Sequence, residues 1–167
     1  MSAAESPGNA LPNGAAVNQV LRLDLPAAHS AARLVRRMIR IFAKSVGIAG
    51  TDLDELLLVA SELVGNAVDH GGGGAALDTD DHRSRMKLAL ELSPGGWVLQ
   101  VSDQGGGRPE VLRELIQPSG PPDLEDERGR GFFLIGQMVD RISVELSEDG
   151  AGLRLVAEKH RPRIGDR

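Results

Sequence analysis

Cysteine and tyrosine are absent from the 167 residues, and aromatic side chains make up only 2% of them. Without cysteine the chain forms no disulfide and no cysteine-based metal site, so a reducing cytoplasm is the compartment we expect. The shortage of aromatics excludes a stacking platform for single-stranded nucleic acid. The formal net charge of −5 also disfavours nucleic-acid binding through a general basic field.

Long hydrophobic runs are lacking as well. No stretch approaches the roughly 20 apolar residues of a membrane-spanning helix, and the first residues show no signal-peptide pattern. We therefore expect a soluble, cytoplasmic protein that contacts neither a membrane nor nucleic acid directly. The length predicts one domain, over residues 19–160, between tails at residues 1–18 and 161–167.

The most regular pattern is the stretch TDLDELLLVASELVGNAVDH, residues 51–70. Its apolar residues recur at spacings of three and four, which predicts a helix with one buried face. The residues expected on that face are Leu53, Leu56, Leu57, Ala60, Leu63, Val64, Ala67 and Val68. Around this helix, other patterns predict strands at residues 21–25, 86–92, 97–101, 142–146 and 153–157, and helices at about 27–46 and 129–141. This order predicts an α+β two-layer sandwich, with helices on one face of a mixed, mostly antiparallel sheet.

The predicted helix over residues 27–46 carries two stripes. Its apolar stripe, which we expect to be buried, consists of Ala31, Val35, Met38, Phe42 and Val46. Its opposite stripe is basic and consists of Arg33, Arg36, Arg37, Arg40 and Lys44. Such a stripe fits a solvated helix face and also a docking surface for an acidic partner, and the sequence leaves both interpretations open.

Three short patterns carry the chemistry. Glu62 and Asn66 are one helical turn apart, so a carboxylate suited to proton transfer and a carboxamide suited to Mg²⁺ share one side of the helix. Asp103 stands at a strand end before three glycines, which permit close approach of a ligand to the backbone. The stretch Arg128-Gly129-Arg130-Gly131-Phe132 opens a predicted helix, whose first N–H groups favour an anion. Each pattern alone also fits an ordinary helix face or polar turn.

Taken in this order, E-x-x-x-N, D-x-G-x-G and G-x-G-F resemble the Bergerat-type nucleotide-binding fold shared by gyrase and histidine kinases. The stretches SELVGNAVDH, VSDQGGG and ERGRGFFLIGQMVDR are most similar to the bacterial anti-sigma-factor serine kinases. The resemblance covers nearly the whole chain, from Leu21 to Ala157. It implies a domain that binds ATP and Mg²⁺.

The resemblance also implies a role for each matching residue. Asn66 would coordinate Mg²⁺, and Glu62 would be the general base that activates an acceptor hydroxyl. Asp103 would accept the adenine amino group, while Gly105 and Gly107 would let the loop pass close to the base.

At the second glycine motif, Gly129 and Gly131 would present N–H groups to the phosphates, and Arg128, Arg130 and Phe132 complete the implied nucleotide-binding set. Residues 108–128 would form a lid over ATP. Leu153 departs from the pattern, because many relatives carry a threonine there that holds adenine through water.

The function implied by the resemblance is that of a protein-serine/threonine kinase in a partner-switching system. Such a kinase phosphorylates a small anti-sigma-factor antagonist of the STAS type and also sequesters a sigma factor. The resemblance is compatible with a homodimer. The alternative is a nucleotide-gated interaction module of the same fold with little or no kinase activity.

Overall fold

Alternation of apolar and polar residues produces five strands in the part of the chain that the computed structural model describes, residues 18–71, 84–117 and 127–161. The strands are β1 (Gln19–Pro26), β2 (Arg85–Ser93), β3 (Gly96–Ser102), β4 (Arg141–Leu146) and β5 (Leu153–His160). They form one sheet in the order β1-β2-β3-β5-β4, and every neighbouring pair is antiparallel. The predicted α+β sandwich is thus confirmed, although the sheet is antiparallel throughout its described strands rather than mixed.

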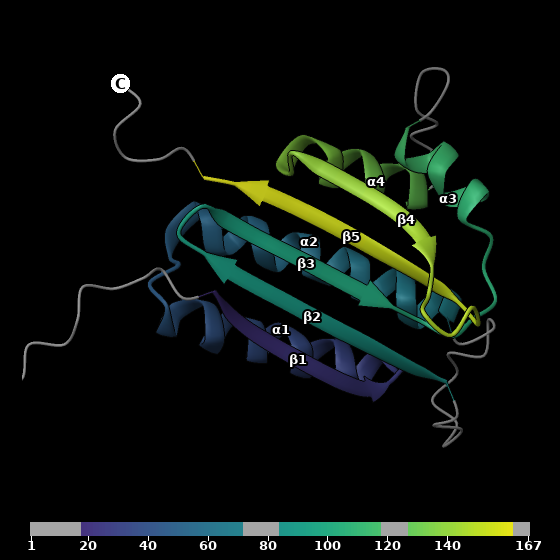
Figure 1. The fold of residues 1–167 in the computed structure, drawn as a ribbon, viewed down its shortest axis with the longest axis horizontal. Coiled ribbons are helices and arrows are strands. Elements are labelled where there is room, and N and C mark those ends of the chain that lie inside the picture. The colour runs from purple at the N-terminus through teal and green to yellow at the C-terminus, as the bar shows by residue number, and fades with distance from the viewer. Residues whose placement is uncertain (1–17, 72–83, 118–126, 162–167) are drawn as a thin grey trace, which may run out of the picture.

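Helices cover one face of this sheet, as Figure 1 shows. They are α1 (His29–Ser45), α2 (Gly50–Gly71), α3 (Pro109–Ile116) and α4 (Glu127–Met138). The pairing register places one apolar row across all five strands, on the face that the helices cover. That row consists of Leu21, Leu90, Leu99, Ala157 and Ile142. The core therefore lies between the sheet and α1, α2 and α4.

The central helix α2 supplies much of the core. All eight residues predicted for its buried face are at most 6% exposed, and Val59 is fully buried as well. At roughly 1.5–3 kcal/mol for each large apolar side chain removed from water, this face is a main source of stability. The helix therefore holds its remaining polar residues in fixed positions.

The buried face of α1 differs from the prediction. Ala31, Val35, Ile39 and Ala43 are buried at a constant spacing of four, whereas Met38 is 37% exposed. The contact of α1 with the core follows one row of residues at spacing four. The predicted stripe left this row at its third residue, where it named Met38 in place of Ile39. Phe42 and Val46 are only partly buried, at the edge of the same core.

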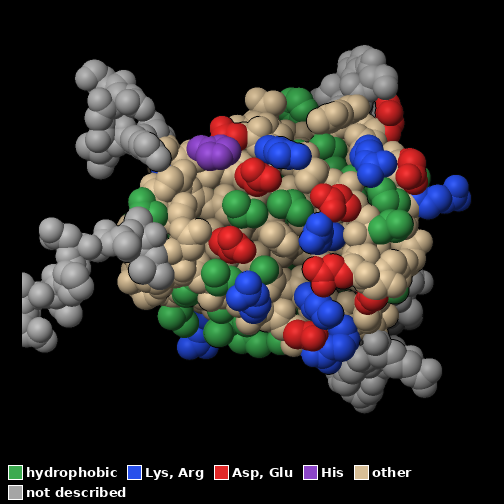
Figure 2. All heavy atoms as spheres, viewed as in Figure 1, with side chains coloured by type: hydrophobic (Ala, Val, Ile, Leu, Met, Phe, Trp, Pro, Cys, Tyr) green, Lys and Arg blue, Asp and Glu red, His purple; other side chains and the backbone are tan. Residues whose placement is uncertain are grey.

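The sheet face opposite the helices remains open. Along one row of this face, the register places Asp24, Lys87, Ser102, Arg154 and Glu145 side by side on successive strands. Figure 2 looks onto this face and shows acidic and basic side chains interspersed with hydrophobic ones. Of the predicted tails, at residues 1–18 and 161–167, residues 1–17 and 162–167 lie outside the described residues.

Candidate functional site

Asp103 is one of two buried polar or charged residues in the described part of the chain, with 9% of its surface exposed. It follows the last residue of β3. Its backbone N–H donates to the carbonyl of Leu153 at 3.0 Å, which extends the β3–β5 ladder by one bond. Its Oδ1 atom accepts the N–H groups of Gly105, at 2.9 Å, and Leu153, at 3.3 Å. A buried carboxylate is therefore held at the end of the sheet by backbone donors.

Glycines shape the loop after Asp103. Gly106 has a φ of +71°, a conformation that residues with a side chain rarely adopt, and its N–H donates to the carbonyl of Ala151 at 2.8 Å. A Cβ atom on Gly107 would lie 2.6 Å from Cδ1 of Leu153. The loop thus packs tightly against the start of β5: a side chain at Gly107 would press on Leu153, and one at Gly106 would strain the backbone.

A cavity of about 250 Å³ opens beside this loop. It is lined by Asn66, Asp103, Gly106, Gly107, Arg108, Val111, Leu112, Leu153 and Leu155. The combination of leucine and valine walls, glycine backbone and one buried carboxylate suits a flat heterocycle that carries an amino group. The volume lies below the roughly 300–1,000 Å³ of pockets for drug-sized ligands, so the described cavity fits a base more closely than an entire nucleotide.

Asn66 lies on the α2 side of this cavity. Its Nδ2 donates to the backbone carbonyl of Glu62 at 2.9 Å, which orients the carboxamide. With the nitrogen committed to the helix, Oδ1 is the atom available as a ligand, and no described residue donates to it. A hard oxygen in this position fits Mg²⁺, which prefers such ligands and usually keeps several waters.

Glu62 lies on the same side of α2, one turn earlier, yet it is absent from the residues that line the cavity. Its carboxylate instead approaches α4, where a Cβ atom on Gly131 would lie 2.7 Å from Oε2 of Glu62. The glycine leaves room for the carboxylate between the two helices. Gly131 is also the fifth residue of α4, so its N–H is used within the helix.

The remaining predicted residues of this motif separate into three groups. Phe132 is only 1% exposed and belongs to the core, so its side chain packs under the sheet and does not line the cavity. Arg130 is exposed on α4. Gly129 lies in the first turn of α4, where N–H groups lack helical partners, while the side chain of Arg128 lies outside the described residues.

The predicted lid is partly a helix. The short α3 follows Arg108, and Pro109 at its first position favours that start. Val111 and Leu112 of this helix reach the cavity, so α3 forms one wall of it. The rest of the lid, residues 118–126, lies outside the described residues. Sequence reasoning missed these wall residues and Gly106, although the apolar pair Val111 and Leu112 was visible as a helical pattern.

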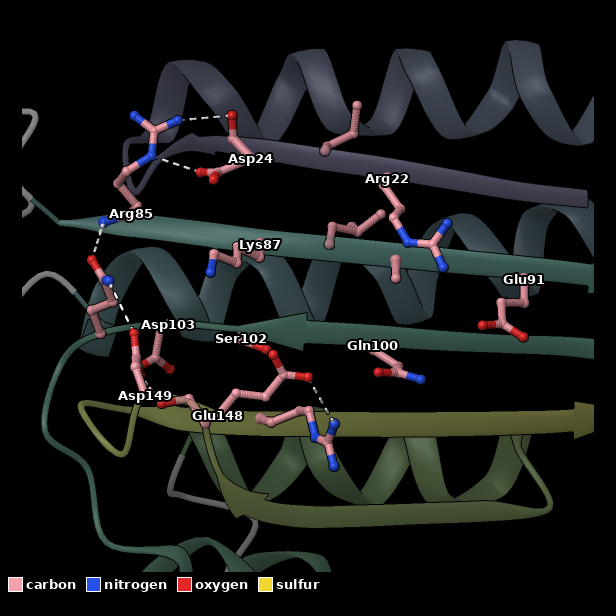
Figure 3. A pocket seen from close by; sticks show the side chains of 16 residues that line it. Arg22, Asp24, Arg85, Lys87, Glu91, Gln100, Ser102, Asp103, Glu148 and Asp149 are labelled. Atoms are coloured by element: carbon pink, nitrogen blue, oxygen red, sulfur yellow. Dashed lines mark hydrogen bonds and ion pairs between the residues drawn. The ribbon is translucent and has the colours of Figure 1, made fainter.

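A second, larger hollow lies on the open face of the sheet, with a volume of about 470 Å³. Side chains of both charges line it, and Asp103, Asp149 and Arg85 lie together at one end (Figure 3). Asp103 therefore borders both hollows. Hydrogen bonds from Ser147, the backbone of Ala151 and Gln104, with the nearby charge of Lys87, lower the pKa of Asp149 to about 2.

Two features are absent from the described residues. None of the helices there combines the length and apolar character needed to cross a bilayer. No group of three or more histidine, aspartate and glutamate side chains is arranged to hold a metal ion in that part of the chain.

Comparison with known proteins agrees with this geometry. Residues 25–157 match the family described as the histidine kinase-like ATPase domain. An anti-sigma F factor of Geobacillus kaustophilus is 32% identical over 111 residues, which cover 65% of this chain and 70% of that protein. The serine-protein kinase RsbW of Bacillus licheniformis is 22% identical over 150 residues, covering 87% and 89%. A chain in the crystal structure of the SiaB-SiaC complex from Pseudomonas aeruginosa has the same fold, with a TM-score of 0.64, 16% identity, and coverage of 83% and 88%.

Proposed function

Because the chain belongs to the family of histidine kinase-like ATPase domains and is homologous to anti-sigma F factors, we propose that it is an ATP-dependent protein-serine/threonine kinase of a partner-switching system. The observation that carries this proposal is the cavity in which Asn66 and Asp103 meet. Its substrates are ATP and a hydroxyl of an anti-sigma-factor antagonist of the STAS type. The named homologues, an anti-sigma F factor and a serine-protein kinase, support both halves of the activity.

Each residue of the cavity has a distinct task in this proposal. Asp103 accepts the amino group of adenine, and its fixed Oδ1 keeps the carboxylate in place as the base enters. The walls formed by Leu112, Leu153 and Leu155 exclude water from the two faces of the base. Gly106 and Gly107 keep the backbone close enough for the base to reach Asp103.

The phosphoryl step uses Asn66 and Glu62, which lie one turn apart on the same side of α2. Asn66 Oδ1 would hold Mg²⁺, which when bound neutralises the phosphate charge. Glu62 takes the proton of the acceptor hydroxyl. At the same time the hydroxyl oxygen bonds to the γ-phosphorus, and the bond from that phosphorus to the ADP oxygen breaks. The absence of a side chain at Gly131 leaves room for the Glu62 carboxylate beside α4, close to the helix N-terminus, which favours an anion.

Two observations favour the second candidate, a nucleotide-gated interaction module without transfer. Glu62 is not part of the cavity lining, and the loss of a hydroxyl at Leu153 removes a polar contact with the base. Binding of a nucleotide needs only Asp103 and Asn66, whereas transfer also needs Glu62 to reach the acceptor. The two candidates therefore differ at one side chain.

In either candidate, the partner protein docks on the exposed face of α1. This helix contains no acidic residue in a chain of net charge −5, and Arg33, Arg37, Arg40 and Lys44 are all exposed on it. Leu34, Met38 and Ile41 are also exposed, at 47%, 37% and 58%, between the basic residues. Apolar side chains ringed by positive charge fit an acidic amphipathic segment of a partner protein.

The test combines binding and transfer. Wild type, Glu62→Gln and Asp69→Asn are titrated with Mg-ATP, and transfer of labelled γ-phosphate to STAS-type antagonists is then measured. Asp69 is the matched control, because it lies on the same helix with an exposed side chain whose nearest basic partner, His29, is 3.6 Å away. The kinase proposal requires that Glu62→Gln binds ATP normally and transfers at least roughly a hundredfold more slowly. Binding without transfer in the wild type supports the interaction module, and absence of binding rejects both.

A further inference from the structure

The β4–β5 turn, residues 147–152, is closed by side chains as well as by backbone. The Ser147 hydroxyl donates to Oδ1 of Asp149 at 2.6 Å and accepts the N–H of Gly152 at 2.9 Å. The N–H of Ala151 donates to the same Oδ1 atom at 3.0 Å. Ser147 is 8% exposed, so its hydroxyl depends on these partners. The turn is therefore a rigid unit with one carboxylate oxygen at its centre.

This turn sits directly against the loop that holds Asp103. The carbonyl of Ala151 accepts the N–H of Gly106 at 2.8 Å. A Cβ atom on Gly152 would lie 2.2 Å from the carbonyl oxygen of Asp103 and 2.5 Å from its Oδ1. Because Gly152 packs against Asp103 with no room for a side chain, and Gly106 is hydrogen-bonded to Ala151, a displacement of the turn displaces the buried carboxylate as well.

Gln104 ties the turn to a third strand. Its Nε2 donates to Oδ2 of Asp149 at 3.2 Å, and its Oε1 accepts the backbone N–H of Arg85 at 3.3 Å. The side chain thus bridges the turn and the start of β2 on the open face of the sheet, where Asp149 lies near Asp103 and the Arg85 side chain extends to Asp24 (Figure 3). Gln104 is the next residue in the chain after Asp103. This bridge therefore fixes the peptide bond that joins it to the residue with the buried carboxylate.

The two carboxylate oxygens of Asp149 have separate tasks. Oδ1 closes the turn through Ser147 and Ala151, whereas Oδ2 contributes nothing to that closure and bonds only to Gln104 among the described residues. Both Gln104 and Asp149 are exposed, so neither is needed to fill the core. What the bond between them adds is a fixed orientation of the loop from Asp103 to Gly107.

We infer that Gln104 and Asp149 are positioning residues for nucleotide recognition, which hold Asp103 in the orientation that reads the base. The inference rests on the proposed binding of ATP. Neither residue lines the cavity beside Asn66, so both act through Asp103 from the opposite face of the sheet. The phosphates, which would bind toward α4, are outside their influence.

The test uses variants that change Oδ2 of Asp149 and leave the turn closed. Asp149→Asn keeps an oxygen for Ser147 and Ala151 but presents an amide to the donor of Gln104. Gln104→Glu keeps the acceptor for Arg85 and sets a second carboxylate against Asp149. The double variant Gln104→Glu/Asp149→Asn restores one hydrogen bond with reversed polarity at the same net charge. Glu148→Gln is the control, since this side chain of the same turn is 89% exposed.

Calorimetry with Mg-ATP and with inorganic tripolyphosphate distinguishes positioning from general loosening. Each single variant is expected to bind Mg-ATP about threefold to tenfold more weakly than the wild type and to bind tripolyphosphate equally well. The double variant is expected to regain the affinity for Mg-ATP. The amide of Gly106 should exchange with solvent faster in the single variants.

Two outcomes overturn the inference. Single variants that bind Mg-ATP like Glu148→Gln show that the bond does not position Asp103, and an equal loss for ATP and tripolyphosphate shows a structural role only. Absence of Mg-ATP binding in the wild type instead rejects the proposed function, and the inference with it.

Discussion

Replacing Asp103 by asparagine changes the group proposed to recognise the base. The new side chain occupies the same position. The asparagine oxygen can take the place of Oδ1 and accept the N–H groups of Gly105 and Leu153, at 2.9 and 3.3 Å in the wild type. The second carboxylate position then carries an NH₂ group. An acceptor for the adenine amino group becomes a donor, while the side chain keeps its volume and shape.

The expected magnitude follows from the burial of this residue. At 9% exposure, the hydrogen bond from the base to Asp103 is shielded from water, and a bond to a charged group is worth about 1.5–3 kcal/mol. At 1.4 kcal/mol for each factor of ten, Asp103→Asn should weaken ATP binding about tenfold to a hundredfold. Guanine, the base of GTP, has a carbonyl where adenine has its amino group, and this carbonyl would accept a hydrogen bond from the new NH₂ group. The ratio of the affinity for ATP to the affinity for GTP should therefore fall by a larger factor than the affinity for ATP itself.

The assay is a calorimetric titration of wild type and Asp103→Asn with Mg-ATP, Mg-GTP and Mg-tripolyphosphate. Tripolyphosphate lacks a base and should bind both proteins equally, which controls for the integrity of the fold. A variant that binds Mg-ATP within about twofold of the wild type would refute base recognition by Asp103. Equal losses for ATP and GTP would also refute it, since they would show a damaged cavity rather than a changed reading group.

Three further predictions concern other contacts. Lys159→Met removes an ammonium that donates at 2.6 Å both to Glu55 and to the last carbonyl of α4, so the free energy of unfolding should fall by about 1.5–3 kcal/mol in denaturant titrations; a loss under about 0.5 kcal/mol contradicts this. Gly131→Ala places a methyl group 2.7 Å from Oε2 of Glu62, so phosphoryl transfer should fall at least about tenfold while thermal stability is kept, because alanine favours helix. Unchanged transfer there would show that the position of Glu62 beside α4 is irrelevant. Because the folded-state pKa of Asp149 is lowered from 3.8 to about 2, its charge stabilises the fold above pH 3.8, and this contribution disappears as pH falls through about 2. The stability difference between wild type and Asp149→Asn should accordingly be constant above pH 3.8 and shrink toward pH 2; a difference that grows on acidification opposes the assignment.

The sequence predicted the fold well where periodicity is strong. The buried face of α2 and all five strands follow directly from spacing, because burial of those residues is set by the element they form. The prediction that Met38 is buried was wrong, because two rows of α1 are apolar and only packing decides which of them faces the sheet. Nucleotide binding by Phe132 stays a prediction, but its motif does not reveal that the helix turns this ring into the core.

The candidate site was predictable only in part. Asn66, Asp103 and Gly107 were named from their motifs and meet at one cavity, although their roles remain proposals. The contact of Gly131 with Glu62 joins two helices and leaves no local signal in the sequence. The bond from Gln104 to Asp149 crosses 45 positions of the chain, and no motif marks either partner.

The strand order has a consequence for how the protein is made. The carboxylate of Asp103 accepts a hydrogen bond from Leu153, 50 positions further along the chain, and β5 separates β3 from β4 in the sheet. The contacts that fix Asp103 thus close a long loop late in folding, after the β2–β3 hairpin, whose partners are local. A ribosome-bound chain that ends before β5 has its motif helix and its Asp103 but no formed cavity. Nucleotide would then bind only after the last strand has emerged, and binding would report that synthesis of the domain is complete.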